Sequence, residues 1–228
     1  AEVNPPPLPI CSGMSYPTAC LRRGGLTVVA RHSRAAPRWD DTAAKLAVEY
    51  QYFYPSMDLH GRGFLGFKMI RAWEPEQAVE TETIYRNDER VQTAYPYAFL
   101  PARIVTATFL DDVPPAGRTD IWKTPRTGLG RVVWVENRHS ARPLHGGSTY
   151  AVFNERTETF AWEEELLIGF WGVPLHYPFV HISGIDASPA LAPEHRTIDP
   201  TYDDYGNVIA QTAKTQGGVQ REFQLVPE

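Results

Sequence analysis

Long apolar runs, an excess of basic residues and a dense set of cysteines are all missing from this sequence of 228 residues. Because a transmembrane helix needs about 20 consecutive apolar residues, we expect no membrane span. The 22 lysines and arginines are outnumbered by 27 aspartates and glutamates, and the net charge of -5 argues against nucleic acid as a partner. The sequence does not begin with methionine, and we expect it to be part of a longer polypeptide.

Cysteine is scarce, with only Cys11 and Cys20 in a proline-rich segment. The two residues can close a small disulfide loop in an oxidising compartment, or they can remain reduced or partly buried thiols. Both alternatives stay open, so the cysteines do not determine the compartment. Cys11 has no histidine near it in the sequence, which argues against a catalytic thiol.

Motifs of common catalytic and cofactor sites are also missing. No Gly-x-Ser-x-Gly elbow is present, and the glycines at 128–130 and 146–147 lack the setting of a phosphate-binding loop. His176 and His181 would point to opposite faces of a strand, and His195 follows in a proline-rich loop, so we expect structural histidines and no metal site. Adjacent acids diverge instead of facing each other across a cleft, as in Glu163-Glu164-Glu165, Asp111-Asp112 and Asp203-Asp204. We therefore expect a non-enzymatic chain with no catalytic residue and no cofactor.

What is present favours an all-β fold. Twenty prolines and seventeen glycines suit many short strands and turns. Eleven tyrosines, ten phenylalanines and six tryptophans suit pleated, half-buried surfaces. We expect antiparallel strands in a curved or coiled sheet, with few or no long helices.

Periodicity places the strands. Residues 46–54 alternate with a period of two, as do residues 79–85, where Glu80 and Glu82 fall on the face that we expect to meet solvent. The segment 40–45 fits a helical turn or a loop, and 158–171 fits a strand pair with a bulge or a short helix, with β structure favoured. Further strands are predicted at 26–30, 67–73, 100–110, 132–135 and 149–153.

A cluster of glycines follows the aromatic strand at 50–54. Glycine tolerates positive φ and close approach of a second backbone, so this cluster predicts a sharp corner between two strands. The residues that define the corner and its flanking aromatics are Tyr52, Gly61, Gly63, Phe64, Gly66 and Phe67. Arg62 is the only charge among the glycines, and we expect its side chain to bond carbonyls or a carboxylate such as Asp58 across the turn, in preference to binding a ligand.

A second turn signal lies at residues 202–208, with the sequence Tyr-Asp-Asp-Tyr-Gly-Asn-Val. An acidic turn that ends in Gly-Asn before an alternating segment predicts a β-hairpin. The residues of this turn are Tyr202, Asp203, Gly206 and Asn207.

The segment Gly61-Arg62-Gly63-Phe64-Leu65-Gly66-Phe67 after an aromatic strand resembles the Rhs/YD-repeat family, especially the B component of bacterial Tc insecticidal toxin complexes. The Tyr-Asp-x-x-Gly-Asn string at residue 202 resembles the core of a YD repeat. This resemblance implies that Tyr202 packs its ring on the shell, while Asp203 and Asn207 fix the turn through side-chain-to-backbone hydrogen bonds. Residues 95–101 loosely echo the family segment that follows the glycine corner. The resemblance implies a YD-like β domain at 46–216, between a proline-rich N-terminal arm with a short strand at 1–45 and a C-terminal tail at 217–228. Only one YD unit is visible, and the self-cleaving core of the family is not recognisable.

The resemblance implies a secreted or cell-surface structural segment of a toxin shell. Its expected partners are the rest of the parent polypeptide, an encapsulated toxin segment and a pore-forming translocation component. A secreted β-sandwich that binds carbohydrate through surface aromatics is the alternative, with Trp73, Trp162 and Trp171 as candidate contacts. A hydrolase is the third and least favoured class.

Overall fold

The chain forms one antiparallel β-sheet over the residues that the computed structural model describes, which are 16–21, 26–35, 45–74, 77–110, 126–145, 149–169, 181–183, 194–216 and 220–224. The sheet has twelve strands in the order β1-β3-β4-β5-β6-β7-β8-β10-β11-β12, with β2 beside β3 and β9 beside β8. Their bounds are Thr18–Cys20 (β1), Arg31–Ala35 (β2), Lys45–Asp58 (β3), Gly63–Glu74 (β4), Val79–Tyr85 (β5), Pro101–Phe109 (β6), Arg126–Leu144 (β7), Thr149–Gly169 (β8), His181–Ser183 (β9), Glu194–Tyr202 (β10), Val208–Thr215 (β11) and Gln220–Gln224 (β12).

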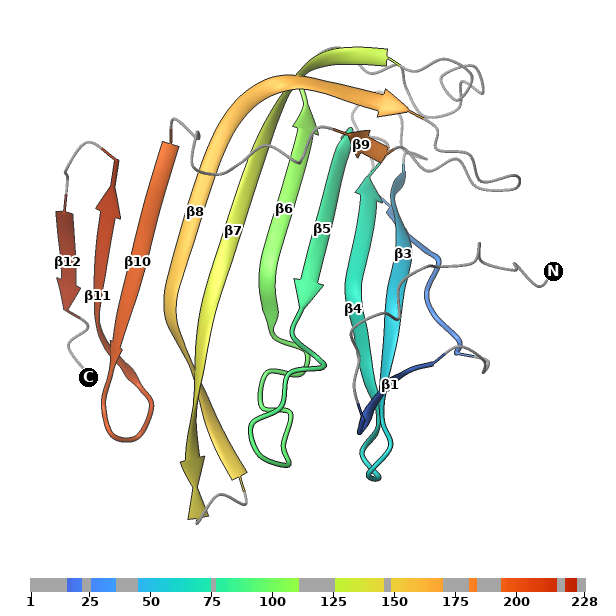
Figure 1. Ribbon diagram of the computed structural model, residues 1–228. Coiled ribbons are helices and arrows are strands. Elements are labelled where there is room, and N and C mark those ends of the chain that lie inside the picture. Colours follow the sequence, from blue (N-terminus) through green and yellow to red (C-terminus); the bar gives the residue numbers. More distant parts are fainter. Residues whose placement is uncertain are drawn as a thin grey trace.

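The sheet is open and curved, and its two ends do not pair with each other (Figure 1). No α-helix occurs in the described residues. The predicted all-β fold of antiparallel strands is therefore confirmed. None of the described segments is a helix with the length and apolarity needed to cross a bilayer.

The longest element is the β7–β8 hairpin, which bends at the end where β7 begins and β8 finishes (Figure 1). The two strands pair from Arg126 opposite Ile168 to Leu144 opposite Thr149. The strands predicted at 132–135 and 149–153 are thus parts of much longer ones. Because the residues up to Gly169 continue β8, the short-helix alternative for this region is wrong. Residues 170 and 171 lie outside the described ranges.

Other predicted elements lie elsewhere than expected. The segment 26–30 is irregular and exposed, and the strand begins at Arg31, where the ladder with β3 starts opposite Glu49. His195 belongs to strand β10 and not to a loop. The possible helical turn at 40–45 falls outside the described residues except for Lys45, which begins β3. Cys20, in β1, is disulfide-bonded.

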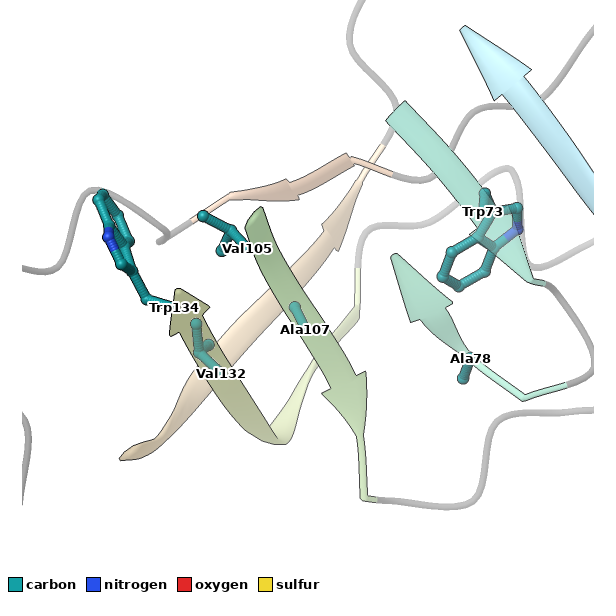
Figure 2. Close-up of a cluster of buried hydrophobic side chains, with 6 residues drawn as sticks. All are labelled: Trp73, Ala78, Val105, Ala107, Val132 and Trp134. Atoms are coloured by element: carbon teal, nitrogen blue, oxygen red, sulfur yellow. The ribbon is translucent and has the colours of Figure 1, made fainter. Parts of the chain in front are cut away.

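The core lies on one face of the central strands. Directly opposed residues of antiparallel strands share a face, and the register places Trp73, Ala107 and Val132 in one row across the sheet. Phe160 and Trp162 of β8 pack against this cluster. The buried members, drawn in Figure 2, are Trp73, Ala78, Val105, Ala107, Val132 and Trp134.

The same face carries a buried ion-pair network. The register sets Glu80 opposite Trp73 and Glu82 opposite Arg71. Arg71 Nε lies 3.0 Å from Glu80 Oε1, and Arg71 Nη2 lies 3.0 Å from Glu82 Oε2. Arg103 Nη2 approaches Glu82 at 3.8 Å. The expectation that the acidic face of this strand meets solvent is wrong for Glu80, which is only 2% exposed. Glu80 lies in the row of buried residues between Trp73 and Ala107, and Arg71 neutralises its carboxylate.

Candidate functional site

The glycine corner is built around a buried carboxylate at the end of β3. Asp58 is 5% exposed. Its Oδ2 accepts the backbone N–H of Arg62 at 3.0 Å, and its Oδ1 accepts the hydroxyl of Tyr95 at 3.1 Å. Gly61 and Gly63 have φ of +113° and +76°, and a Cβ at either position would meet no atom within 4 Å. Glycine is therefore needed at these two positions for the left-handed backbone and not for space.

The Tyr95 hydroxyl joins three segments of the chain. Because it donates to Asp58, it accepts the hydroxyl of Thr18 in β1, 3.0 Å away. All three residues are buried. The backbone N–H of Leu59 also donates to the carbonyl of Pro17 at 2.9 Å, so β1 is tied to the corner beside this chain of hydroxyls. A buried carboxylate with satisfied acceptors makes the corner rigid.

Burial alone would raise the pKa of Asp58. Hydrogen bonds from the backbone N–H groups of Arg62 and His60, then the Tyr95 hydroxyl and the charge of His60, outweigh it and hold the pKa below its ordinary value. Asp58 is thus an ionised structural centre of the turn. A proton-transfer role would call for a pKa shifted toward neutrality.

Arg62 holds the turn in a different way from the one expected. Its backbone N–H bonds Asp58, while the predicted side-chain bond to that carboxylate is not made. The guanidinium carbon instead lies 6.0 Å from the centroid of the Tyr95 ring, on an exposed side chain. The hydrogen bond that closes the turn is made by the backbone N–H of residue 62, so it does not need an arginine side chain at this position.

Gly66 is the point of closest approach in the corner. Its φ is +100°, and a Cβ would stand 2.8 Å from Asn87 Nδ2 and 2.9 Å from Phe99 Cε1. Asn87 is 1% exposed. It donates to the carbonyl of Phe67 at 2.8 Å and accepts the backbone N–H of Phe99 at 2.7 Å. One amide therefore clamps the 86–100 loop onto β4, and the missing side chain of Gly66 leaves the room for it.

The aromatics around the corner pack on one another. The ring centroids of Tyr52 and Phe67 are 4.8 Å apart, and those of Phe64 and Phe67 are 5.3 Å apart. The Tyr52 hydroxyl donates to the carbonyl of Val29 at 2.9 Å, and burial, followed by the neighbouring Tyr50, raises the pKa of Tyr52. These contacts anchor the segment before β2 to β3.

The second predicted motif forms the β10–β11 hairpin. Asp203 Oδ1 accepts the backbone N–H groups of Tyr205 at 2.9 Å and Asn207 at 2.8 Å, and its Oδ2 accepts the Asn207 side-chain amide at 2.9 Å. The side-chain-to-backbone bonds expected of Asp203 are therefore made, whereas the Asn207 side chain bonds the Asp203 carboxylate and not the backbone. Gly206 has φ of +91°, and a Cβ there would stand 3.1 Å from the Phe153 ring. The Tyr202 ring packs edge-on against Phe153 at 5.1 Å.

Tyr202 also fastens this hairpin to the preceding one. Its hydroxyl donates to the carbonyl of Asn154 in β8 at 2.9 Å. Arg156 of β8 adds a two-point contact to Asp199 of β10, with Nε 2.7 Å from Oδ1 and Nη2 3.3 Å from Oδ2. The hydrogen bonds that the Asn207 side chain and backbone donate are the largest cause of the lowered pKa of Asp203, so the turn is held by an ionised carboxylate.

The two motifs do not come together in one site. Strands β5 to β8 lie between β4, which follows the glycine corner, and β10, which precedes the second turn. Sequence reasoning did not identify Asn87, Tyr95 or Thr18 as partners of the corner. A signal existed only for Tyr95, since it begins the 95–101 segment that echoes the resembled family after its glycine corner.

Other candidate residues lie in structural settings. His195 stacks on Phe160, with ring centroids 4.4 Å apart, and its Nε2 lies 3.7 Å from Glu158 Oε1. Within the described ranges, no three metal-ligating side chains gather as an ion would require. Trp73 is buried in the core and Trp162 packs against it, so neither offers an open platform for sugar stacking. The described ranges do not include Asp111, Asp112, His176 or Trp171.

We expect the unfolding free energy to fall as the pH drops below about 4. Asp58 and Asp203 have folded-state pKa values below their ordinary ones. Their contribution is present above the unfolded-state pKa and is lost as the pH falls through the folded-state pKa. Urea unfolding across this range should show a smaller acid loss for Asp203→Asn than for the wild type. Equal acid losses in the two proteins would contradict this assignment.

No family model, curated protein or solved structure matches this chain.

Proposed function

We propose that this chain is a non-catalytic structural segment of an Rhs/toxin-complex type β shell, which encloses a toxic polypeptide and helps to deliver it. The observation that carries the proposal is the β10–β11 hairpin. Its Tyr-Asp-x-x-Gly-Asn turn is held by Asp203 and Asn207, and Tyr202 bonds it to the neighbouring long hairpin. A turn of this design can be repeated, because each tyrosine needs only a carbonyl of the preceding hairpin.

The form of the sheet supports the same proposal. Neighbouring strands are antiparallel throughout the described sheet, the sheet curves, and β1 and β12 are not joined to each other (Figure 1). Unpaired sheet edges are normally covered by further strands or by other parts of a protein. The partners under this proposal are the rest of a longer shell polypeptide, the enclosed toxin segment and a translocation component. The location would be the cell surface or the extracellular space.

The test is to isolate the native protein with an antibody raised against this chain, sequence it by mass spectrometry and image it by electron microscopy. We expect a longer polypeptide with further Tyr-Asp-x-x-Gly-Asn hairpins, a hollow particle, and an internal segment that resists protease until the particle is opened. A polypeptide without further such hairpins, or a solid particle, would refute the shell. Reproducible sugar binding by this chain on a glycan array would do so as well.

A further inference from the structure

Apolar side chains are exposed around the glycine corner. Tyr16 is 73% exposed, Leu59 54%, Phe64 38% and Phe99 65%. The Tyr16 hydroxyl lies 2.5 Å from Nε2 of His60 in the turn. Leu59 belongs to the turn, Phe64 is the second residue of β4, and the Phe99 ring lies against Gly66. We call these four residues the corner patch. Clustered exposure of large apolar groups is typical of an interaction surface.

Phe99, a member of the patch, is held in an unfavourable backbone conformation. Its φ is +67°, in the left-handed region that residues with a bulky side chain rarely adopt. Asn87 fixes this conformation by accepting the Phe99 N–H at 2.7 Å. Asparagine or glycine would suit the backbone better, and with 65% of the residue exposed the ring contributes little to the core. Stability alone therefore does not account for phenylalanine at this position.

The charged residues of the turn and of the 86–100 loop are unbalanced. The acidic residues that follow Asn87 already have partners: Asp88 Oδ2 accepts from Lys68 at 2.9 Å, and Glu89 pairs with Arg86. Arg62 and Arg90 make no ion pair with a carboxylate in the described part of the chain. Arg90 donates to the carbonyl of Gln92, and Arg62 lies over Tyr95. A protein of net charge -5 thus carries, among its described residues, two arginines without a carboxylate partner, Arg62 in the turn beside Leu59 and Arg90 in the loop that holds Phe99.

We propose that the corner patch docks an acidic polypeptide segment that carries apolar side chains. The exposed rings and Leu59 would take the apolar side chains, and Arg62 and Arg90 would attract the acidic ones. The Asp58–Tyr95 bond and the Asn87 clamp hold the platform rigid before binding, which lowers the entropy lost on association. The proposal rests on this corner alone and is independent of the shell proposal.

The test uses the whole chain and a phage-displayed library of random peptides. We expect selected peptides to be rich in Asp, Glu and apolar residues, and to bind more weakly as salt is added. In fluorescence anisotropy, Phe99→Asn and Arg62→Glu should each weaken binding by about tenfold or more. Phe99→Asn should leave the urea midpoint unchanged or higher, because asparagine tolerates the left-handed backbone. The matched control is Tyr205→Asn, which removes a 92% exposed ring from the β10–β11 turn and should leave binding unchanged.

Several results would overturn the proposal. The absence of enriched peptides, the selection of basic peptides, or equal binding by wild type and Phe99→Asn would each do so. Concentration-dependent dimerisation that Phe99→Asn abolishes would identify a second copy of the chain as the occupant. Sedimentation with phosphatidylcholine–phosphatidylserine vesicles, without peptide binding, would identify a lipid surface. Either of the last two results would contradict the proposal, because the ligand would then be a second copy of the chain or a lipid surface and not an acidic segment.

Discussion

Replacing Gly66 with alanine is expected to lower the free energy of unfolding by roughly 2–5 kcal/mol, the sum of a left-handed backbone penalty and overpacking. The φ of +100° disfavours any Cβ, and the added atom would stand 2.8 Å from Asn87 Nδ2. Phe99 could swing aside, since it is exposed, but Asn87 is 1% exposed and bonded at both ends of its amide. The clamp on the 86–100 loop would have to move. Urea unfolding at neutral pH measures the loss.

Gly61→Ala and Gly63→Ala are the matched controls. Both positions have positive φ, but a Cβ at either would meet no atom within 4 Å. Each control should therefore carry only the backbone penalty of about 1–2 kcal/mol. If Gly66→Ala were no more destabilising than Gly61→Ala and Gly63→Ala, the close approach of Asn87 would have no energetic consequence and the clamp would be disproved.

Changing Arg71 to methionine is expected to lower the free energy of unfolding by about 3 kcal/mol or more, because the buried carboxylate of Glu80 loses its guanidinium partner. Glu80 is 2% exposed, and Arg71 lies 3.0 Å from it and 3.0 Å from Glu82. Arg71 also places its guanidinium 5.4 Å from the Phe53 ring centroid, so its removal loosens the contact between β3 and β4 as well. The loss is read from the urea midpoint and from the temperature of unfolding.

The double variant Arg71→Met with Glu80→Met separates charge from packing. It should recover most of the loss, since well-packed apolar groups can replace a buried ion pair at little cost. Arg131→Met is the control for an exposed ion pair, since Arg131 and Glu194 are 3.1 Å apart with side chains 48% and 68% exposed. This variant should change the free energy of unfolding by no more than about 1 kcal/mol. A double variant as unstable as the single one would show that packing around Arg71, and not charge, sets the effect.

The two turns differ in how much of them was predictable. At residues 202–207 the hydrogen bonds that Asp203 accepts span two to four positions. The groups that make the turn are therefore neighbours in the sequence, and the motif is sufficient to predict them. At the glycine corner only the positive φ values were predictable. The partners of Asp58 and Gly66 come from Tyr95 and Asn87, which are distant in sequence and follow no local period.

The strands show the same division. The alternation at 79–85 predicted a strand, and β5 occupies that range. It did not predict which face is buried, because two acidic residues indicate solvent unless a cation comes to them from another strand. Arg71 is that cation, and it comes from β4. The register between β4 and β5 that places it there cannot be derived from the alternation of β5 alone. The same limit divided β7 and β8 into several short predicted strands, since a continuous ladder depends on both partners.

By itself the sequence determined the all-β class, the antiparallel hairpins and the positions of the two turns, because these depend on side-chain period, backbone φ and hydrogen bonds within a few residues. Only the tertiary structure decided the order of strands in the open sheet, the burial of Glu80, and the clamp of Asn87 on Gly66. The physical reason is that burial and close approach depend on which distant segments pack together. It is also why the glycine corner, predicted from its sequence as a turn, becomes in the folded chain the base of an exposed patch.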